Sequence, residues 1–262
     1  MRLRFLGTGT SYGVPYIGCK CAVCTSTDAR DKRLRASIVI EDGEGENLLR
    51  ILVDTGPDFR QQMLRADIDK IDAIFWTHAH NDHIIGLDDV RPLSDRHGYI
   101  KGYCDEKTME RLDKVFDYCF IQDRDHGGFP RVTPKVIEPF ETVKIGEVSV
   151  TPLPISHGRA GTIFAYEFEK AGKRFVYASD CVGIPPKSMK RMKGAEVFIV
   201  DALRHAAHPN HFNIEQALKA IEKINPRQAF FTHITHDLPH QETEDSLPEP
   251  VKVAFDGLEL EI

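Results

Sequence analysis

The sequence predicts a single layered α/β domain spanning residues 1–262. Short apolar runs rich in β-branched residues recur along the chain, helical patterns lie between them, and no repeat or long linker divides them. Strands interspersed with helices in this way favour one layered domain over two separate ones. With 262 residues, of which 41% are hydrophobic, the chain can bury the core that such a domain needs.

The expected strands are short and are bounded by Gly, Pro, Asp or His, as strands usually are. They are Leu3–Leu6, Ser37–Ile40, Leu48–Val53, Ile71–Trp76, Val148–Leu153, Thr162–Phe168, Arg174–Ala178, Val197–Val200 and Ala229–Thr232. Near the C-terminus, Val251–Phe255 and Leu258–Ile262 flank the dipeptide Asp256-Gly257. This dipeptide is typical of a tight turn, so we expect a hairpin there.

Helices are expected where apolar residues recur at helical spacing. The clearest is Ile214–Ile224, because Asn213 and Gln216 can form a capping box at its start and Pro226 follows its end. The other expected helices are Phe59–Ala66, Ile84–Leu93, Glu106–Phe120 and Pro186–Met192. The stretch Gln122–Pro134 has little pattern and is expected to be a surface loop.

The overall composition narrows the function classes. The net charge of −6 disfavours a nucleic-acid-binding surface, which usually needs a basic stripe. No apolar run reaches the roughly 18 residues of a membrane span, so no membrane association is expected. The segment Met1–Gly7 looks like a first strand and lacks the pattern of a signal peptide. We therefore expect a cytoplasmic protein.

A cluster of three histidines and one aspartate directly follows the run Ile71–Trp76. It comprises His78, His80, Asp82 and His83. Residues two apart in an extended stretch point the same way, so His78 and His80 can share one metal ion. Asp82 and His83 can reach a second ion once the chain has turned. Imidazole and carboxylate ligands suit zinc, manganese, iron or nickel.

Three more candidate ligands each follow an apolar run. His157, Asp180 and His233 occupy such positions, and the carboxylate of Asp180 can bridge two ions. The ends of strands are where sheet proteins commonly build their sites. The alternative for each residue alone is an ordinary loop or capping role.

A second metal site is expected near the N-terminus. Cys19, Cys21 and Cys24 offer three thiolates, and a closed structural zinc site needs a fourth ligand. His236 is the best candidate because it lies three residues after His233 and can point the other way. The alternative is that the cysteines are ordinary reduced thiols.

These motifs resemble those of the metallo-β-lactamase-fold hydrolases. The resemblance covers essentially the whole chain and implies a four-layer αβ/βα sandwich with a dinuclear site at one edge of its sheets. It implies one ion held by His78, His80 and His157. The other ion would be held by Asp82, His83 and His233, with Asp180 bridging. Asp54 matches an early aspartate that usually orients the ligand loop.

The cysteine cluster and the paired late histidines resemble, more narrowly, the cyclic phosphodiesterases of the carbon–phosphorus lyase pathway. The resemblance implies hydrolysis of phosphoribosyl 1,2-cyclic phosphate, a small phosphodiester. Two divalent ions, zinc or manganese with nickel as a third choice, suit attack by a metal-bridging hydroxide. We expect His211 and Asp82 to act in catalysis, with His211 as general acid and His208 as second choice. Arg159, Arg204 and the amides of Gly7–Ser11 are candidate phosphate anchors.

Other functions remain open for the same motifs. One is tRNA 3′-end processing, against which the acidic charge and the lack of a long basic insert both argue. Another is thioester or lactam hydrolysis, for which an acid equivalent to His211 is not expected. A third is a non-catalytic metal-binding protein of cofactor biosynthesis, although the His78–His83 loop is intact here. The sequence does not decide between a monomer and a homodimer.

Overall fold

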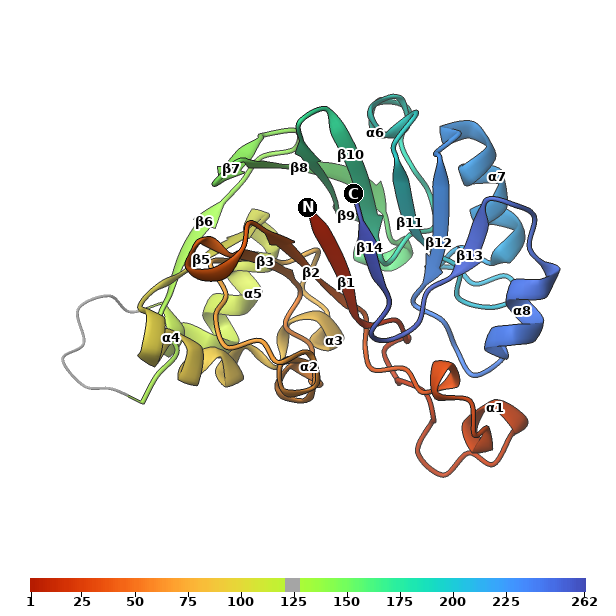
Figure 1. Ribbon diagram of the computed structural model, residues 1–262, viewed down its shortest axis with the longest axis horizontal. Helices are drawn as coiled ribbons and strands as arrows, with labels where there is room; N and C mark the ends of the chain where they lie inside the picture. The colour runs from red at the N-terminus through yellow and green to blue at the C-terminus, as the bar shows by residue number, and fades with distance from the viewer. Residues whose placement is uncertain (121–127) are drawn as a thin grey trace.

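The computed structural model describes residues 1–120 and 128–262 of the chain. Two seven-stranded sheets face each other, and helices cover the outer face of each sheet (Figure 1). This is the four-layer αβ/βα sandwich, so the predicted fold class is confirmed. Within these ranges, no helix combines the length and apolar character needed to cross a membrane.

The first sheet is formed by the first half of the chain together with the last strand. Its strands in spatial order are β14 (Glu259–Glu261), β1 (Arg2–Gly7), β2 (Ser37–Asp42), β3 (Leu49–Val53), β4 (Ala73–Phe75), β5 (Ile100–Cys104) and β6 (Val132–Val136). The strands from β3 to β6 are parallel, and the others pair antiparallel. Its helices are α2 (Phe59–Ala66), α4 (Arg91–His97) and α5 (Glu106–Phe116). Because β14 pairs with β1, the two termini lie close together (Figure 1).

The second sheet has the same mixed character. Its strands in spatial order are β13 (Val251–Val253), β12 (Gln228–Thr232), β11 (Val197–Asp201), β10 (Lys173–Ala178), β9 (Thr162–Lys170), β8 (Val148–Ser156) and β7 (Val143–Ile145). The strands from β10 to β13 are parallel, so their carboxyl ends share one edge. Its helices are α6 (Pro186–Met192), α7 (Ile214–Ile224) and α8 (His240–Ser246).

Shorter helical turns lie in the connections. They are α1 (Ala22–Thr25), η1 (Ala29–Asp31), η2 (Gly45–Asn47), α3 (Asn81–Ile84), η3 (Leu87–Val90), η4 (Asp117–Cys119) and η5 (Gly158–Ala160), where η marks a 3₁₀ helix.

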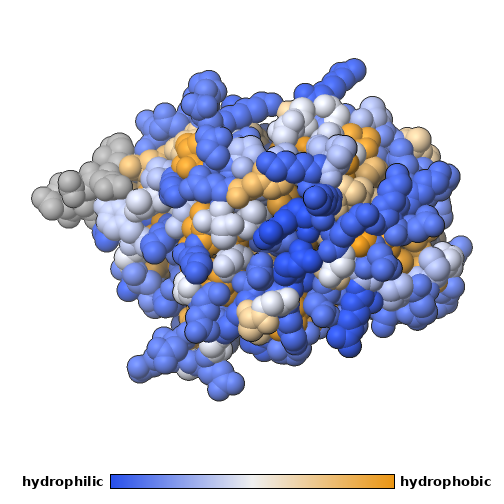
Figure 2. All heavy atoms as spheres, turned by 90° about the horizontal axis from the view of Figure 1, so that it is seen from above, coloured by the Kyte–Doolittle hydropathy of each residue, from blue (hydrophilic) through white to orange (hydrophobic). Residues whose placement is uncertain are grey.

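The core is divided between three interfaces of the four layers. Alternate residues of a strand face opposite ways. In β3, Ile51 and Val53 lie between the sheets while Leu52 packs under the helices. In β10, Phe175 lies between the sheets and Val176 faces the helices that cover the second sheet. Burial on both faces explains why the strands are nearly continuous apolar runs. On the face seen in Figure 2, hydrophilic residues surround small groups of apolar ones.

The predicted C-terminal hairpin is wrong. β13 pairs in parallel with β12 in the second sheet, whereas β14 pairs with β1 in the first. The dipeptide Asp256-Gly257 therefore links the two sheets instead of turning within one. The Asp256 carboxylate, whose side chain is 3% exposed, accepts hydrogen bonds from the Thr8 hydroxyl (2.8 Å) and the Leu34 amide (2.8 Å). These contacts with residues far away in the sequence hold Asp256 beside the first sheet, where β14 then pairs with β1.

Two other predicted elements are also corrected. The expected helix Ile84–Leu93 is interrupted at Gly86, where a side-chain Cβ would lie 2.0 Å from the Gly56 carbonyl oxygen. The expected loop Gln122–Pro134 ends inside β6; its residues 122–127 lie outside the described ranges. Pro134 masks the strand pattern, but an edge strand such as β6 tolerates proline.

Candidate metal centres and active site

The ligand loop that follows β4 is held by one buried carboxylate. Asp54, at the end of β3, accepts hydrogen bonds from the Thr77 amide (2.8 Å) and hydroxyl (2.9 Å). Its Oδ2 also contacts Nδ1 of His83 at 2.7 Å. Since Thr77 donates to Asp54, its hydroxyl can accept from Nδ1 of His78 at 3.0 Å. Both histidines are thereby oriented with Nε2 free for other contacts. Asp54 takes the orienting position that the resemblance implies.

His78, His80 and His157 form the first ligand group. One ring nitrogen from each lies within 4.8 Å of the others. His157 follows β8, and its Nδ1 donates to the Asn210 carbonyl oxygen at 2.9 Å. Its Nε2 consequently faces Nδ1 of His80 at 3.3 Å. The three nitrogens thus converge as the ligands of one ion would.

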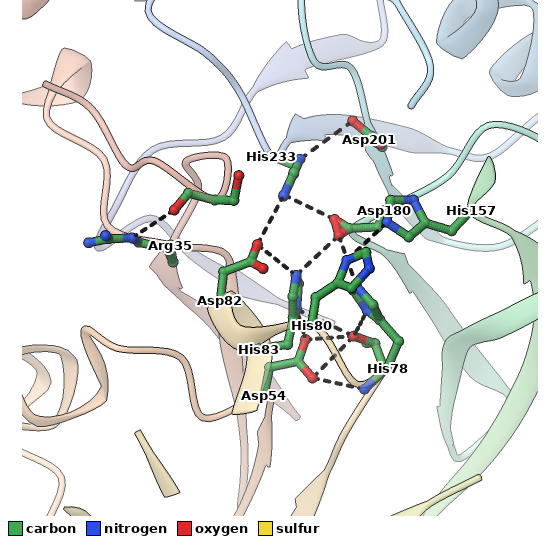
Figure 3. Close-up of polar contacts among 12 residues, drawn as sticks. Arg35, Asp54, His78, His80, Asp82, His83, His157, Asp180, Asp201 and His233 are labelled. Carbon is green, nitrogen blue, oxygen red and sulfur yellow. Dashed lines mark hydrogen bonds and ion pairs between the residues drawn. The ribbon is translucent and has the colours of Figure 1, made fainter. Parts of the chain in front are cut away.

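Asp82, His83 and His233 form the second group, and Asp180 lies between the two (Figure 3). Oδ2 of Asp180 is 3.1 Å from Nε2 of His83 and 3.9 Å from Nε2 of His78. Its Oδ1 is 3.0 Å from Nε2 of His233. Asp180 follows β10 and His233 follows β12, two parallel strands on either side of β11, so both residues lie at the same edge of the sheet. All seven sequence-predicted ligands are therefore brought together.

The electrostatics of this cluster suit a bound divalent cation. Burial lowers the pKa of His157 to about 4 and that of His78 well below its usual range. Burial also disfavours a charged His233, yet Asp180 and Asp82 outweigh it and raise its pKa to about 10. In the same way, carboxylates raise the pKa of the buried His83. The first ligand group therefore offers neutral imidazoles, and in the second group the carboxylates of Asp82 and Asp180 attract positive charge.

The donor atoms of the two ligand groups are also of the kind that bind a divalent metal. Nε2 of His78 is buried and has no hydrogen-bond partner in the described part of the chain. An orphaned buried polar atom is costly unless something unseen satisfies it. Nitrogen and carboxylate oxygen donors in such groups are typical of zinc and related divalent metals.

The predicted cysteine site is assembled from the two ends of the chain. Nδ1 of His236 lies 3.3, 3.6 and 3.4 Å from the sulfur atoms of Cys19, Cys21 and Cys24. Zinc bond lengths of about 2.3 Å to sulfur and 2.0–2.1 Å to nitrogen in a tetrahedron place these atoms about 3.6 Å apart. The ring of Tyr16 stacks on His236 at 3.8 Å between centroids. The geometry therefore fits a tetrahedral Cys₃His site.

His211 lies beside the ligand groups and contacts a residue that the sequence analysis missed. Its Nδ1 is 2.7 Å from Oδ2 of Asp201, which also accepts from the Cys181 amide at 2.9 Å. The His211 ring stacks on His233 at 4.8 Å. Burial, aided by the charge of His233, lowers the pKa of His211 to about 4. Asp201 directly follows an apolar run, the same signal that identified Asp180, so this pattern could have revealed it.

One cavity of about 510 Å³ opens over both ligand groups. Besides metal-group side chains and His211, its lining includes Ser11, Arg111, His208 and Asn210. Ser11 belongs to the predicted Gly7–Ser11 segment.

The two proposed phosphate anchors, Arg159 and Arg204, are absent from the described lining of this cavity. Arg159 is exposed in η5, whose backbone folds back so that the Arg159 amide donates to Oδ1 of Asn210. Nε of Arg204 is buried. Arg111 instead supplies a cation. It lies on the polar face of an amphipathic helix, where nothing local distinguishes it from other exposed residues.

Comparison with known proteins places the chain in a family. The family described as "Beta-lactamase superfamily domain" matches residues 49–234. Along 99% of its length the chain is 36% identical to an octanoyltransferase of Porphyromonas gingivalis, but it spans only about half (51%) of that protein.

Two solved structures are similar over nearly the whole chain. A zinc-bound PqqB from Methylobacterium extorquens, 21% identical, covers 100% of both chains with a TM-score of 0.82, which supports the fold alone. A diphosphatase from the PhnP family is 41% identical, with a TM-score of 0.88, over 99% of this chain and 97% of its own. The chain therefore belongs to the beta-lactamase superfamily and, within it, to the PhnP family.

Proposed function

We propose that this protein is a dinuclear-metal phosphodiesterase that hydrolyses a small cyclic phosphodiester such as phosphoribosyl 1,2-cyclic phosphate. Its membership of a metallo-hydrolase family supports metal-dependent hydrolysis in general. The observation that carries the finer proposal is the position of Asp180 between two ligand groups in one cavity beside His211. Paired divalent metals suit in-line displacement at phosphorus.

In this proposal, some residues around the cavity bind the metal ions and others orient the rings of the metal ligands. Two divalent ions held by these groups would supply an activated water and neutralise charge on the phosphoryl oxygens. Asp54 fixes the His83 ring, and the Asn210 carbonyl fixes that of His157. Such outer partners orient ligand rings and set which nitrogen is available.

His211 is the proposed proton donor to the leaving oxygen. Asp201 engages its Nδ1, which leaves Nε2 as the nitrogen that can face a substrate in the cavity. With a pKa of about 4, the His211 ring is neutral at pH 7 in the free protein. Proton donation therefore requires that the negative charge of the bound phosphodiester raise this pKa. The Asp201 carboxyl, 2.7 Å from Nδ1 of His211, would stabilise an imidazolium in its ionised form, and burial raises the pKa of Asp201.

The cysteine site is proposed to hold one structural zinc. It joins the segment around Cys21 to the loop that carries both His233 and His236. The amide of Cys24 donates to the Cys21 sulfur and lowers the pKa of that thiol, which favours the thiolate that binds metal.

Diphosphate hydrolysis is the second candidate, because the solved relative with 41% identity is described as a diphosphatase. Processing of tRNA is less well supported, since the chain is acidic. A substrate panel that contains cyclic phosphodiesters, linear diesters and diphosphates separates these functions.

The proposal is tested by His80→Ala in protein reconstituted separately with zinc, manganese and nickel. Hydrolysis of bis(p-nitrophenyl) phosphate and of a 2′,3′-cyclic nucleotide should fall by more than about 100-fold. Changes to outer partners of metal ligands already cost about 10- to 100-fold. His97→Ala, which removes an exposed histidine from the end of α4, is the matched control. Unchanged turnover by the His80 variant would refute the ligand assignment.

A further inference from the structure

A short segment that follows β1 holds the loop that carries His233. The Ile234 amide donates to the Thr8 carbonyl oxygen at 3.0 Å, and the Thr10 amide donates to the Ile234 carbonyl oxygen at 3.1 Å. Gly9 and Ile234 thereby pair as a parallel bridge. Ile234 directly follows a proposed metal ligand, so the backbone beside that ligand is fixed through both its donor and its acceptor.

The same contacts change the interpretation of the backbone amides of Gly7–Ser11, which are candidate phosphate anchors by sequence. The Gly9 amide donates to the Leu34 carbonyl oxygen at 2.8 Å, and the Thr10 amide is engaged by Ile234. Two amides at the centre of this segment are therefore bonded within the protein. Their observed contribution is to hold neighbouring loops in place, and they are not free to bind a phosphate.

The backbone conformation of His233 needs such support. Its φ is +59°, in the left-handed region that residues other than glycine seldom adopt. A residue persists there only where the surrounding structure fixes it. In this conformation, Nε2 of His233 lies 3.0 Å from Oδ1 of Asp180 and 3.8 Å from Oδ2 of Asp82. The position of this ligand nitrogen therefore depends on the contacts of the adjacent Ile234.

The side chain of Thr8 anchors the supporting segment in a buried polar network. Its hydroxyl donates to Oδ1 of Asp256 at 2.8 Å and accepts from Nη1 of Arg33 at 2.8 Å. The same Nη1 donates to the Ala254 carbonyl oxygen at 2.6 Å, and Nη2 lies 3.1 Å from Nδ1 of His240. Thr8 and Arg33 are 0% and 2% exposed. A buried hydroxyl that both donates and accepts is held in one orientation, and removing it leaves charged partners unsatisfied.

We propose that Thr8 is a positioning residue for the metal ion of the second ligand group. Its hydroxyl fixes the segment that binds Ile234, and Ile234 in turn holds His233 in its left-handed conformation. The inference rests on the proposed ligand role of His233 and does not depend on which phosphoester is hydrolysed. It gives the Gly-Thr-Gly-Thr sequence of Gly7–Thr10 a function at the metal site.

The test is a double-mutant cycle on metal affinity, measured by calorimetric titration of Co²⁺ into protein stripped of its exchangeable ions. Thr8→Val keeps the branched shape of the side chain and removes the hydroxyl. It should weaken the binding of one ion by about tenfold, the lower end of the range for groups that orient metal ligands. In a His233→Ala background the same substitution should have no further effect, because the two residues act through one path.

Two further variants separate positioning from a general loss of stability. Thr8→Ser keeps the hydroxyl and should bind Co²⁺ as the wild type does. Thr151→Val removes a hydrogen-bonded hydroxyl from a buried residue of β8 and should also leave the affinity unchanged. If Thr8→Val does not fold, Arg33→Lys replaces it, since lysine keeps the charge but lacks the guanidinium fork. The same loss, absent in the His233→Ala background, is then expected.

The outcomes distinguish this inference from the proposed function. A wild type that binds two exchangeable Co²⁺ ions but hydrolyses no phosphodiester refutes the proposed function, and the cycle still tests Thr8. Wild-type affinity in the folded Thr8→Val variant overturns the role of Thr8 alone. A loss of equal size in the His233→Ala background overturns it as well, because Thr8 would then act on the site by a path that does not include His233.

Discussion

Replacing Cys21 by serine should release the structural zinc without disturbing the local helix. Cys21 is the N-cap of α1, and its side chain accepts from the Cys24 amide. Serine is itself a favourable N-cap, so the capping hydrogen bond is retained. The substitution therefore isolates the contribution of the thiolate to the metal site.

The expected loss of stability is large because the local apolar core of this segment is small. Among the described residues, its local core contains three buried apolar side chains, Val14, Val23 and Cys24, with Tyr16 and Cys19 packed against them. Burying one such side chain stabilises the folded state by about 1.5–3 kcal/mol, whereas fixing the backbone of each residue costs about 1–2 kcal/mol. Apolar burial alone therefore does not offset the entropy cost of ordering this segment. A metal present at 1,000 times its Kd contributes about 4 kcal/mol. For a chain of this size, that corresponds to roughly 8–16 °C in Tm.

The assay combines metal analysis, thermal unfolding and limited proteolysis. Wild-type protein should hold about three metals per chain, two exchangeable and one tightly bound. Cys21→Ser should lose the tight one, melt at lower temperature and be cleaved within residues 11–31. Ile17→Ser, a change at a fully exposed position of the same segment, should match the wild type. Retention of zinc and Tm would refute the reasoning, and a stable but inactive variant would point to a catalytic role for the cysteines.

Two further predictions concern the proton donor and acid stability. His211→Asn should lower kcat by about 10²- to 10⁴-fold for a substrate with a sugar alkoxide as leaving group, and far less for p-nitrophenolate, which needs no proton. An equal loss of kcat on both substrates in steady-state kinetics would argue against proton donation by His211. Glu41 is buried against Arg2 (2.6 Å) and Arg50 (2.9 Å); burial raises its pKa, but these arginines outweigh burial and lower it. Its stabilisation is therefore present above pH 4.5 and lost as the pH falls through the lower folded pKa. Glu41→Gln should cost about 1–2 kcal/mol at pH 7 and less at pH 3, as measured by urea unfolding, and a loss independent of pH would contradict this account.

The candidate ligands could be found in the sequence because their signals are local. His78, His80 and His83 lie within six residues, and Asp180 and His233 directly follow apolar runs. Parallel strands of one sheet have their carboxyl ends at one edge, so positions that follow β10 and β12 are expected to lie close together. The position of Asp201 carries the same signal and could have been predicted with them.

Other parts of the site have no local signal. Arg111 is one of several charged residues on the polar face of α5, and only the packing of that helix brings it to the cavity. Lys107 lies on the same helix, and only the structure shows that its Nζ donates to the Ala160 carbonyl oxygen. The polar face of a surface helix tolerates many side chains, so its pattern does not show which residue meets a ligand.

The sequence by itself determined the strand-rich layered fold, the histidine loop and the cysteine cluster, because apolar periodicity and ligand spacing act over a few residues. Only the tertiary structure decided which distant segments meet. It brought Cys21 beside His236, paired Asp201 with His211, and sent β14 to the sheet opposite β13. The physical reason is that sheet assignment depends on pairing between remote strands and on buried polar contacts such as that of Asp256. These are properties of the assembled fold that no short stretch of sequence contains.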